Sequence, residues 1–455
     1  MNWRSYTSEF GTNFKLAWPV MVGYLGHMLV GLADNIMVGK LGPTALAAVS
    51  LGNSTVFFIM SFGFGFSSAI TPLVSQALGQ KNKERIHRIF YNGILINAIL
   101  GLLMIVLVWL LIPFLHRAHQ PPEVLKLAVP YIKVIAISVV FVMIFQAMKQ
   151  FSDGLGHTKL SMRAMIYTNI LNIILNYVFI YGFWVIPAMG VLGAGWGTLI
   201  SRFLVLFVFY FLLQKFPATS DYVKQLPEKI LDLSIVKKIV SLGIPSGYQS
   251  VFEMGIFTAS VWLAGTLGKI PQAANQIALQ LASMTFMVFL GFSVAATIRT
   301  GYRLGQKDYA GLRRVAFSIF LQSMLIGMIF SMIYLVFREE LPWIYLSRKN
   351  ITPEVLETAR LASGLLVIAA LFQISDSLQV TIQGALRGLQ DVKIPALLTF
   401  TAYWIIGFPI AYFGRLQWGV QGIWYGLIAG LTMAALFLFI RFYYLTNKMI
   451  HHENA

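Results

Sequence analysis

Long apolar runs separated by short charged or Pro/Gly-containing breaks dominate the chain. The runs from Phe90 to Leu115 and from Trp418 to Ile440 contain no Asp, Glu, Lys or Arg. A helix needs about 20 apolar residues to cross a bilayer core. We expect twelve such helices, at 15–38, 49–78, 90–115, 128–150, 159–182, 190–214, 236–264, 275–300, 312–337, 356–384, 394–414 and 418–446. The pattern therefore predicts an all-α polytopic membrane protein.

Composition agrees with a membrane protein and bears on its orientation. Only 11% of residues are charged, against about 25% in an ordinary soluble domain. The net charge of +17 is spread over many short loops, without the aromatic-interleaved basic patch that would indicate nucleic acid. Most Lys and Arg lie in loops on one side, which predicts cytoplasmic N- and C-termini in a cell (inner) membrane. The absence of cysteine excludes disulfides and thiol catalysis.

The two halves of the chain repeat each other. LGQKNKER begins at Leu78 and LGQKDYAG begins at Leu304, which is 226 positions later. The same offset relates Pro19 to Pro245, and GVLGAGWG (190–197) matches GVQGIWYG (419–426) at an offset of 229. Six helices separate equivalent points, so both repeats enter the membrane from the same side. We expect two six-helix lobes related by a parallel internal repeat, 1–220 and 221–455, with 215–238 as a cytoplasmic linker.

Of the 17 acidic residues, 14 fall in tails, loops or helix ends, and three fall inside predicted spans away from their ends: Asp34, Glu253 and Asp376. A charge at the bilayer centre costs about 2.5–3.5 kcal/mol, so each carboxylate should face a cavity or a partner. For Asp34 the alternative is an interfacial carboxylate, because Lys40 follows only six residues later. For Glu253 and Asp376 the alternative is structural ion pairing.

Further polar groups share these helices. The offset of 226 relates Glu253 to His27, which lies seven residues before Asp34 on the same helix face. A packing role is the favoured interpretation of His27, and a secondary coupling role is the alternative. Asn169, Asn172 and Asn176 form one polar stripe. Their oxygens serve either interhelical hydrogen bonds or a hard cation such as Na⁺, with Thr198 as a further donor.

Several motifs together resemble one transporter family. They are the acid in GLADNIMVG (31–39), the Pro245-to-Glu253 spacing, the acid at Asp376, QGALRGLQDVKIP (383–395) and ANQIALQ (274–280). In this order and spacing they are similar to the multidrug and toxic compound extrusion family, with the NorM-type branch as the best match. The resemblance covers essentially the whole chain.

The resemblance implies specific site residues. An N-lobe cation-coupling site would comprise Asp34, Asn172, Asn176 and Thr198, and a C-lobe site would comprise Glu253 and Asp376; Na⁺ would bind at either. Two positions depart from the family pattern. Phe372 stands where related proteins have a tyrosine, and Asn176 stands where some relatives have an acid. Both changes remove oxygen or charge, so the choice between H⁺ and Na⁺ stays open.

The resemblance also implies a function. The expected protein is a monomeric, cation-coupled antiporter without a cofactor that exports bulky lipophilic, often cationic drugs by alternating access. Its partners are small molecules and the lipid bilayer, not nucleic acid. The alternative is a lipid-linked oligosaccharide flippase of the same superfamily, for which a more cationic cavity is expected. An enzyme is disfavoured because HExxH, GxSxG and paired protease-type aspartates are missing.

Overall fold

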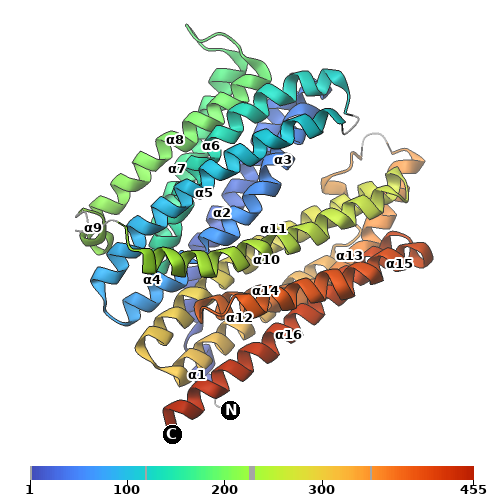
Figure 1. Cartoon of the computed structure of the whole chain (residues 1–455). Helices are drawn as coiled ribbons and strands as arrows, with labels where there is room; N and C mark the ends of the chain where they lie inside the picture. Colours follow the sequence, from blue (N-terminus) through green and yellow to red (C-terminus); the bar gives the residue numbers. More distant parts are fainter. Residues whose placement is uncertain (1–2, 118–119, 225–230, 349–350, 455) are drawn as a thin grey trace. The chain divides into compact units, whose positions relative to one another are not determined.

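The protein is helical throughout the described segments. The computed structural model describes residues 3–117, 120–224, 231–348 and 351–454, where the only β pairing is an isolated bridge between Phe183 and Ile186 (Figure 1). In these segments, eleven helical stretches have the length and composition of membrane spans. The twelfth expected span is α10 (Leu233–Gly265), which has 33 residues but carries Glu253 and several other polar side chains. The predicted all-α membrane fold is confirmed.

The backbone contacts group the chain into two compact units, which are described separately. One unit comprises residues 22–247, and the other comprises 1–21 together with 248–455. Both α2 (Phe10–Gly39) and α10 therefore begin in one unit and continue into the other. The boundary residues Met21 and Gly247 are 226 positions apart, which is the offset of the sequence repeat, and each follows a helical proline, Pro19 or Pro245, by two residues.

The division at 220/221 was expected from the sequence repeat, and as a division into lobes it stays a prediction. Within the expected linker 215–238, α8 ends at Lys215, α9 covers Pro217–Val223 and α10 begins at Leu233. Residues 225–230 of that linker lie outside the described residues.

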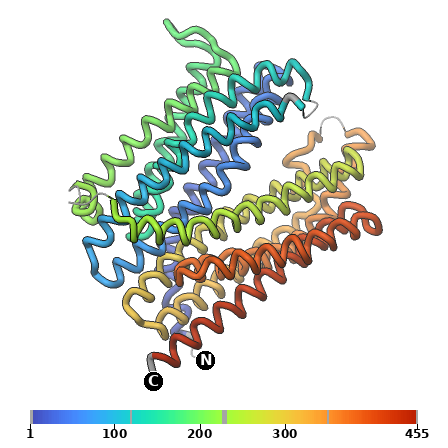
Figure 2. Tube along the Cα trace, viewed as in Figure 1, coloured from blue at the N-terminus to red at the C-terminus, as the bar shows by residue number. Residues whose placement is uncertain are grey.

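The unit of residues 22–247 contains the later part of α2 and a bundle of long helices that run side by side (Figure 2). Its apolar core includes Val49, Ile132 and Val139. Besides α2, its elements are α3 (Pro43–Ser67), α4 (Ile70–Gly79), α5 (Lys83–Arg117), α6 (Pro122–Gly154), α7 (Thr158–Tyr181), α8 (Gly190–Lys215), α9 and the beginning of α10.

The apolar packing of the other unit includes two clusters of buried side chains. One surrounds Trp424 and Leu366, and the other surrounds Phe292, Phe320 and Phe442. Its elements are α1 (Trp3–Thr7), the beginning of α2, the later part of α10, α11 (Lys269–Gln306), α12 (Tyr309–Val336), η1 (Leu341–Ile344), α13 (Pro353–Gly388), α14 (Lys393–Phe400), η2 (Thr401–Gly407), α15 (Phe408–Trp418) and α16 (Val420–Asn454). In Figure 1, α1 and the end of α16 lie at the same end of this unit.

Left-handed backbone positions follow the sequence repeat. Gly42 and Gly268, offset by 226, have φ of 112° and 111° at the starts of α3 and α11. Lys81 and Lys307, at the same offset, have φ of 57° and 61°. Such values favour glycine and are uncommon for other residues. Their occurrence at paired positions shows that the duplicated sequence encodes duplicated local geometry.

Candidate functional site

In the unit of residues 22–247, Asp34 on α2 is held by α7. Its side chain is half-buried, and Asn176 Nδ2 donates a hydrogen bond of 2.8 Å to Asp34 Oδ1. The same amide nitrogen lies 3.3 Å from Asn172 Oδ1, one turn away on α7. Asn176 Oδ1 is buried and has no hydrogen-bond partner among the described residues. Asp34 is therefore an amide-bound carboxylate, with an unpaired amide oxygen beside it.

Helix α8 completes this network. Asn172 Nδ2 donates to Thr198 Oγ1 at 3.3 Å and to Ser201 Oγ at 3.2 Å. The close approach of α7 and α8 depends on Gly197, because a Cβ atom there would overlap Asn176 Oδ1. The structure thus brings together Asp34, Asn172, Asn176 and Thr198, the four residues predicted for this site.

Arg202 is a part of the site that the sequence analysis did not identify. Its Nη1 donates to Ser138 Oγ on α6 at 2.7 Å, and its charge interacts electrostatically with Asp34 and Tyr131. The signal was its place one turn after Thr198, on the same face of α8. The site therefore contains one carboxylate and one guanidinium.

His27 and Asn169 lie on the same two helices, α2 and α7. By its surface area the His27 side chain is exposed, and the charge of Arg202 acts on it electrostatically. Asn169 Nδ2 faces Gly26, where an added Cβ atom would lie 3.0 Å from it. The packing and coupling roles of His27 both stay predictions.

In the other unit, Asp376 on α13 interacts electrostatically with Glu253 on α10. The Asp376 side chain is 2% exposed, and its Oδ2 has no hydrogen-bond partner among the described residues. Glu253 Oε1 accepts a hydrogen bond of 3.1 Å from Gln379 Nε2. Arg387, two turns further along α13, acts electrostatically on Glu253. One buried and one half-buried carboxyl group thus interact electrostatically, and a half-buried guanidinium acts on the second of them.

Glutamines extend this site along α13. Gln373 is fully buried, and neither its Oε1 nor its Nε2 has a hydrogen-bond partner in the described segments. Gln379 Nε2 also contacts Gln383 Oε1 at 3.2 Å. These glutamines were not predicted as site residues, although their spacing from Asp376 places them with it on one face of α13.

Phe372, which stands where related proteins have a tyrosine, leaves this position without a phenol. Phe372 packs against Trp424, with ring centroids 5.6 Å apart. A buried phenol is supplied instead by Tyr403, which interacts electrostatically with Glu253 and Asp376. Tyr403 lies in η2, a π-helical segment, a type of irregularity that often occurs at functional sites.

Comparisons with known proteins match this chain to one family. The MatE family model matches residues 19–178 and 245–413, two segments whose starts are 226 positions apart. The probable multidrug resistance protein NorM of Rhizobium meliloti (strain 1021) is 33% identical over 98% of this chain and 95% of its own length. MdtK, a multidrug resistance protein of Yersinia enterocolitica, is 31% identical over 98% of this chain and 97% of its own.

Solved structures show the same fold. A crystal structure of a MATE protein in the bent conformation superimposes with a TM-score of 0.87 and 21% sequence identity. That superposition covers 97% of this chain and 96% of the other. The family model covers well over half of the sequence, and the curated relatives cover nearly all of it. The chain therefore belongs to the MatE family, the multidrug and toxic compound extrusion family that its motifs resemble.

Proposed function

We propose that this chain is a cation-coupled antiporter that exports bulky lipophilic, often cationic compounds by alternating access. The names of the NorM and MdtK relatives support drugs as cargo. H⁺ or Na⁺ is the coupling ion, and the protein acts as a monomer in the inner membrane with both termini in the cytoplasm. The mechanism requires small-molecule cargo and a bilayer, and no resident cofactor.

The observation that carries this proposal is the pairing of Glu253 with Asp376. Oxygens of Asp376 and Gln373 are buried without hydrogen-bond partners among the described residues. Leaving a buried polar atom unpaired costs about 1–3 kcal/mol of stability. A role in binding a cation would explain why the fold keeps these groups despite that cost. Carboxylate and amide oxygens are ligands for hard cations, and a carboxylate is also a proton acceptor.

Either cation reduces the negative charge of the Glu253–Asp376 pair when it binds. Alternating access follows if the ion and the drug prefer different conformations, since a ligand shifts an equilibrium only by its differential affinity for the two states. A cationic drug and the coupling cation would favour opposite charge states of the carboxylates. Entry of one then promotes release of the other, which is antiport.

The Asp34 network is the second proposed coupling site. Asn176 donates to its carboxylate, Asn172 and Thr198 extend the network behind Asn176, and the charge of Arg202 acts on Asp34. An entering proton or Na⁺ would compete with these partners for Asp34. Binding there would replace the hydrogen bond between Asn176 and Asp34. Because that bond joins α7 to α2, its loss would change how the two helices pack.

The test is dye efflux from proteoliposomes in which Na⁺ and pH gradients are imposed separately. Asp34→Asn and Asp376→Asn should abolish coupled efflux while the protein remains folded. Asp391→Asn is the matched control, because that carboxylate is paired with Arg441 at 2.7 Å outside both sites. Undiminished efflux in both site variants would refute the assignment. Tight binding of lipid-linked oligosaccharide without drug efflux would favour the flippase alternative.

A further inference from the structure

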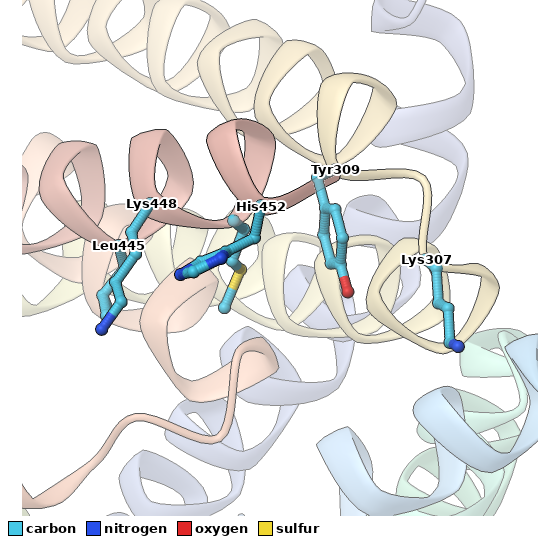
Figure 3. Close-up of a pocket in the computed structure, with 6 residues that line it drawn as sticks. Lys307, Tyr309, Leu445, Lys448 and His452 are labelled. Atoms are coloured by element: carbon cyan, nitrogen blue, oxygen red, sulfur yellow. The ribbon is translucent and has the colours of Figure 1, made fainter. Parts of the chain in front are cut away.

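A basic pocket lies at the end of the unit that carries α1 and the end of α16. Its cavity of about 540 Å³ is lined by Lys307, Tyr309, Leu445, Lys448, Met449 and His452. Figure 3 shows Lys307 and Tyr309 at the turn between α11 and α12, beside Lys448 and His452 of α16. All four polar side chains extend to the same side of the helices (Figure 3). We call these six residues the α12–α16 basic pocket.

The lysines of this pocket have no carboxylate partner among the described side chains. Within the described residues, neither Lys307 nor Lys448 forms an ion pair. Asp308, which adjoins Lys307 in sequence, pairs with Arg303 at 2.7 Å and caps α12 by accepting from the Gly311 N–H at 2.8 Å. Its carboxylate is thus engaged elsewhere. Two lysine ammonium groups, an imidazole and a phenol remain to interact with an anion.

The two walls of the pocket are fixed to each other. Arg313 on α12 donates to Asn447 Oδ1 on α16 at 2.6 Å and lies 4.4 Å from the ring centroid of Tyr443. Lys307 occupies a left-handed turn position, where its N–H bonds to the Leu304 carbonyl at 3.1 Å. These contacts hold the backbone that carries the basic side chains. Little further ordering of the backbone is therefore needed when a ligand binds.

The position of the pocket along the spans indicates the ligand. Three helices that are long and apolar enough to cross a membrane, Lys269–Gln306, Tyr309–Val336 and Val420–His452, end or begin at this level. Such helices leave the hydrocarbon core toward their ends, and basic pockets between helices on that side of a membrane suit acidic lipid headgroups. Leu445 and Met449 add an apolar wall beside the charged groups. A phosphate ester with an attached apolar chain would match both the basic residues and the apolar residues that line the pocket.

We propose that the α12–α16 basic pocket binds a phosphate-bearing anion. Lysines bind phosphate as point charges, and Tyr309 and His452 supply further donors. A phospholipid headgroup and a soluble phosphate compound share this chemistry. The proposal is independent of the transport function, because the pocket shares no residue with the Asp34 or Glu253–Asp376 sites.

The test compares two lipids and two soluble anions on the purified full-length protein. Phosphatidylglycerol is titrated against phosphatidylcholine in nanodiscs, and retained lipid is counted by native mass spectrometry. Inorganic phosphate and glycerol 3-phosphate are titrated in detergent. A lysine near an acidic surface contributes about 1 kcal/mol, so the K307Q/K448Q double variant should bind about 25-fold more weakly than wild type, while K307R/K448R should retain binding.

The control variant is Lys81→Gln. Lys81 occupies the same left-handed position in the other repeat, so its substitution repeats the local backbone effect outside the pocket. Loss of phosphatidylglycerol in the double variant alone supports a headgroup site, and loss of soluble phosphate binding in that variant alone supports a soluble ligand. Equal affinity of wild type and the double variant for all the anions, or an equal loss in Lys81→Gln, would overturn the proposal.

Discussion

Substitution of Asp376 by Asn should make the protein more stable and at the same time abolish coupled transport. The side chain is 2% exposed, its Oδ2 has no hydrogen-bond partner among the described residues, and a second carboxyl group, that of Glu253, acts on it. Asparagine has nearly the same shape, removes the charge and adds a donor next to Glu253. Relieving one unpaired buried polar atom is worth about 1–3 kcal/mol. Asp376→Asn should therefore raise the free energy of unfolding by about that amount and abolish coupled efflux.

Two measurements on the same preparation check this prediction: the thermal unfolding midpoint in detergent, and dye efflux after reconstitution. Asp391→Asn should behave in the opposite way, because it breaks a mostly buried 2.7 Å ion pair with Arg441. It should cost about 1.5–3 kcal/mol, the range for hydrogen bonds to charged groups, and leave coupling intact. If Asp376→Asn lowers the unfolding midpoint and still supports coupled efflux, Asp376 is a structural residue and the reasoning fails.

Three further predictions concern helix packing, ion pairing and acid stability. Gly197→Ala should cost about 1–3 kcal/mol by overpacking against α7, whereas Gly31→Ala, which meets open space, should not destabilise; thermal unfolding of the two compares them. Glu9→Gln should lower the unfolding midpoint more than Glu354→Gln, because the Glu9 pair is largely buried and the Glu354 pair is exposed. Hydrogen bonds from a nearby serine hold the pKa of Asp232 below its usual range. Its contribution to stability is thus present at neutral pH and lost as pH falls through that lowered pKa, and an acid titration of unfolding for Asp232→Asn should lack this component.

The sequence predicted the membrane fold well because bilayer physics leaves few alternatives. Apolar length alone located most spans, and the repeat motifs located their equivalents. Residue Lys81 illustrates why: LGQK recurs at Lys307, and both lysines adopt the same left-handed turn. The exception is α10, whose polar side chains make it too hydrophilic for a span criterion based on composition, although its length is sufficient.

The candidate sites were predicted less completely, since contacts between helices depend on rotation about each helix axis. Asp34, Asn172 and Asn176 were identified because polar residues are rare in such helices, and the structure brings them together. Arg202 was missed, although it lies in the middle of α8, where a charged side chain is as unusual as the three acids inside the spans. In the other repeat its equivalent at the offset of 229 is Leu431, which is fully buried. At these positions the two repeats share backbone conformation but differ in side-chain charge.

This divergence bears on which site accepts the coupling cation. With ionised side chains, Asp34 and Arg202 give the first site a formal charge of zero. Glu253, Asp376 and Arg387 give the second site one excess negative charge. A monovalent cation that enters the second site brings it to neutrality, whereas the same ion in the first site leaves an uncompensated positive charge unless it displaces Arg202 from Asp34. Burying an unpaired charge costs several kcal/mol. In the proposed antiport cycle the Glu253–Asp376 site is therefore occupied first, and Asp34 takes an ion only when a rearrangement of α2 against α8 weakens its electrostatic interaction with Arg202.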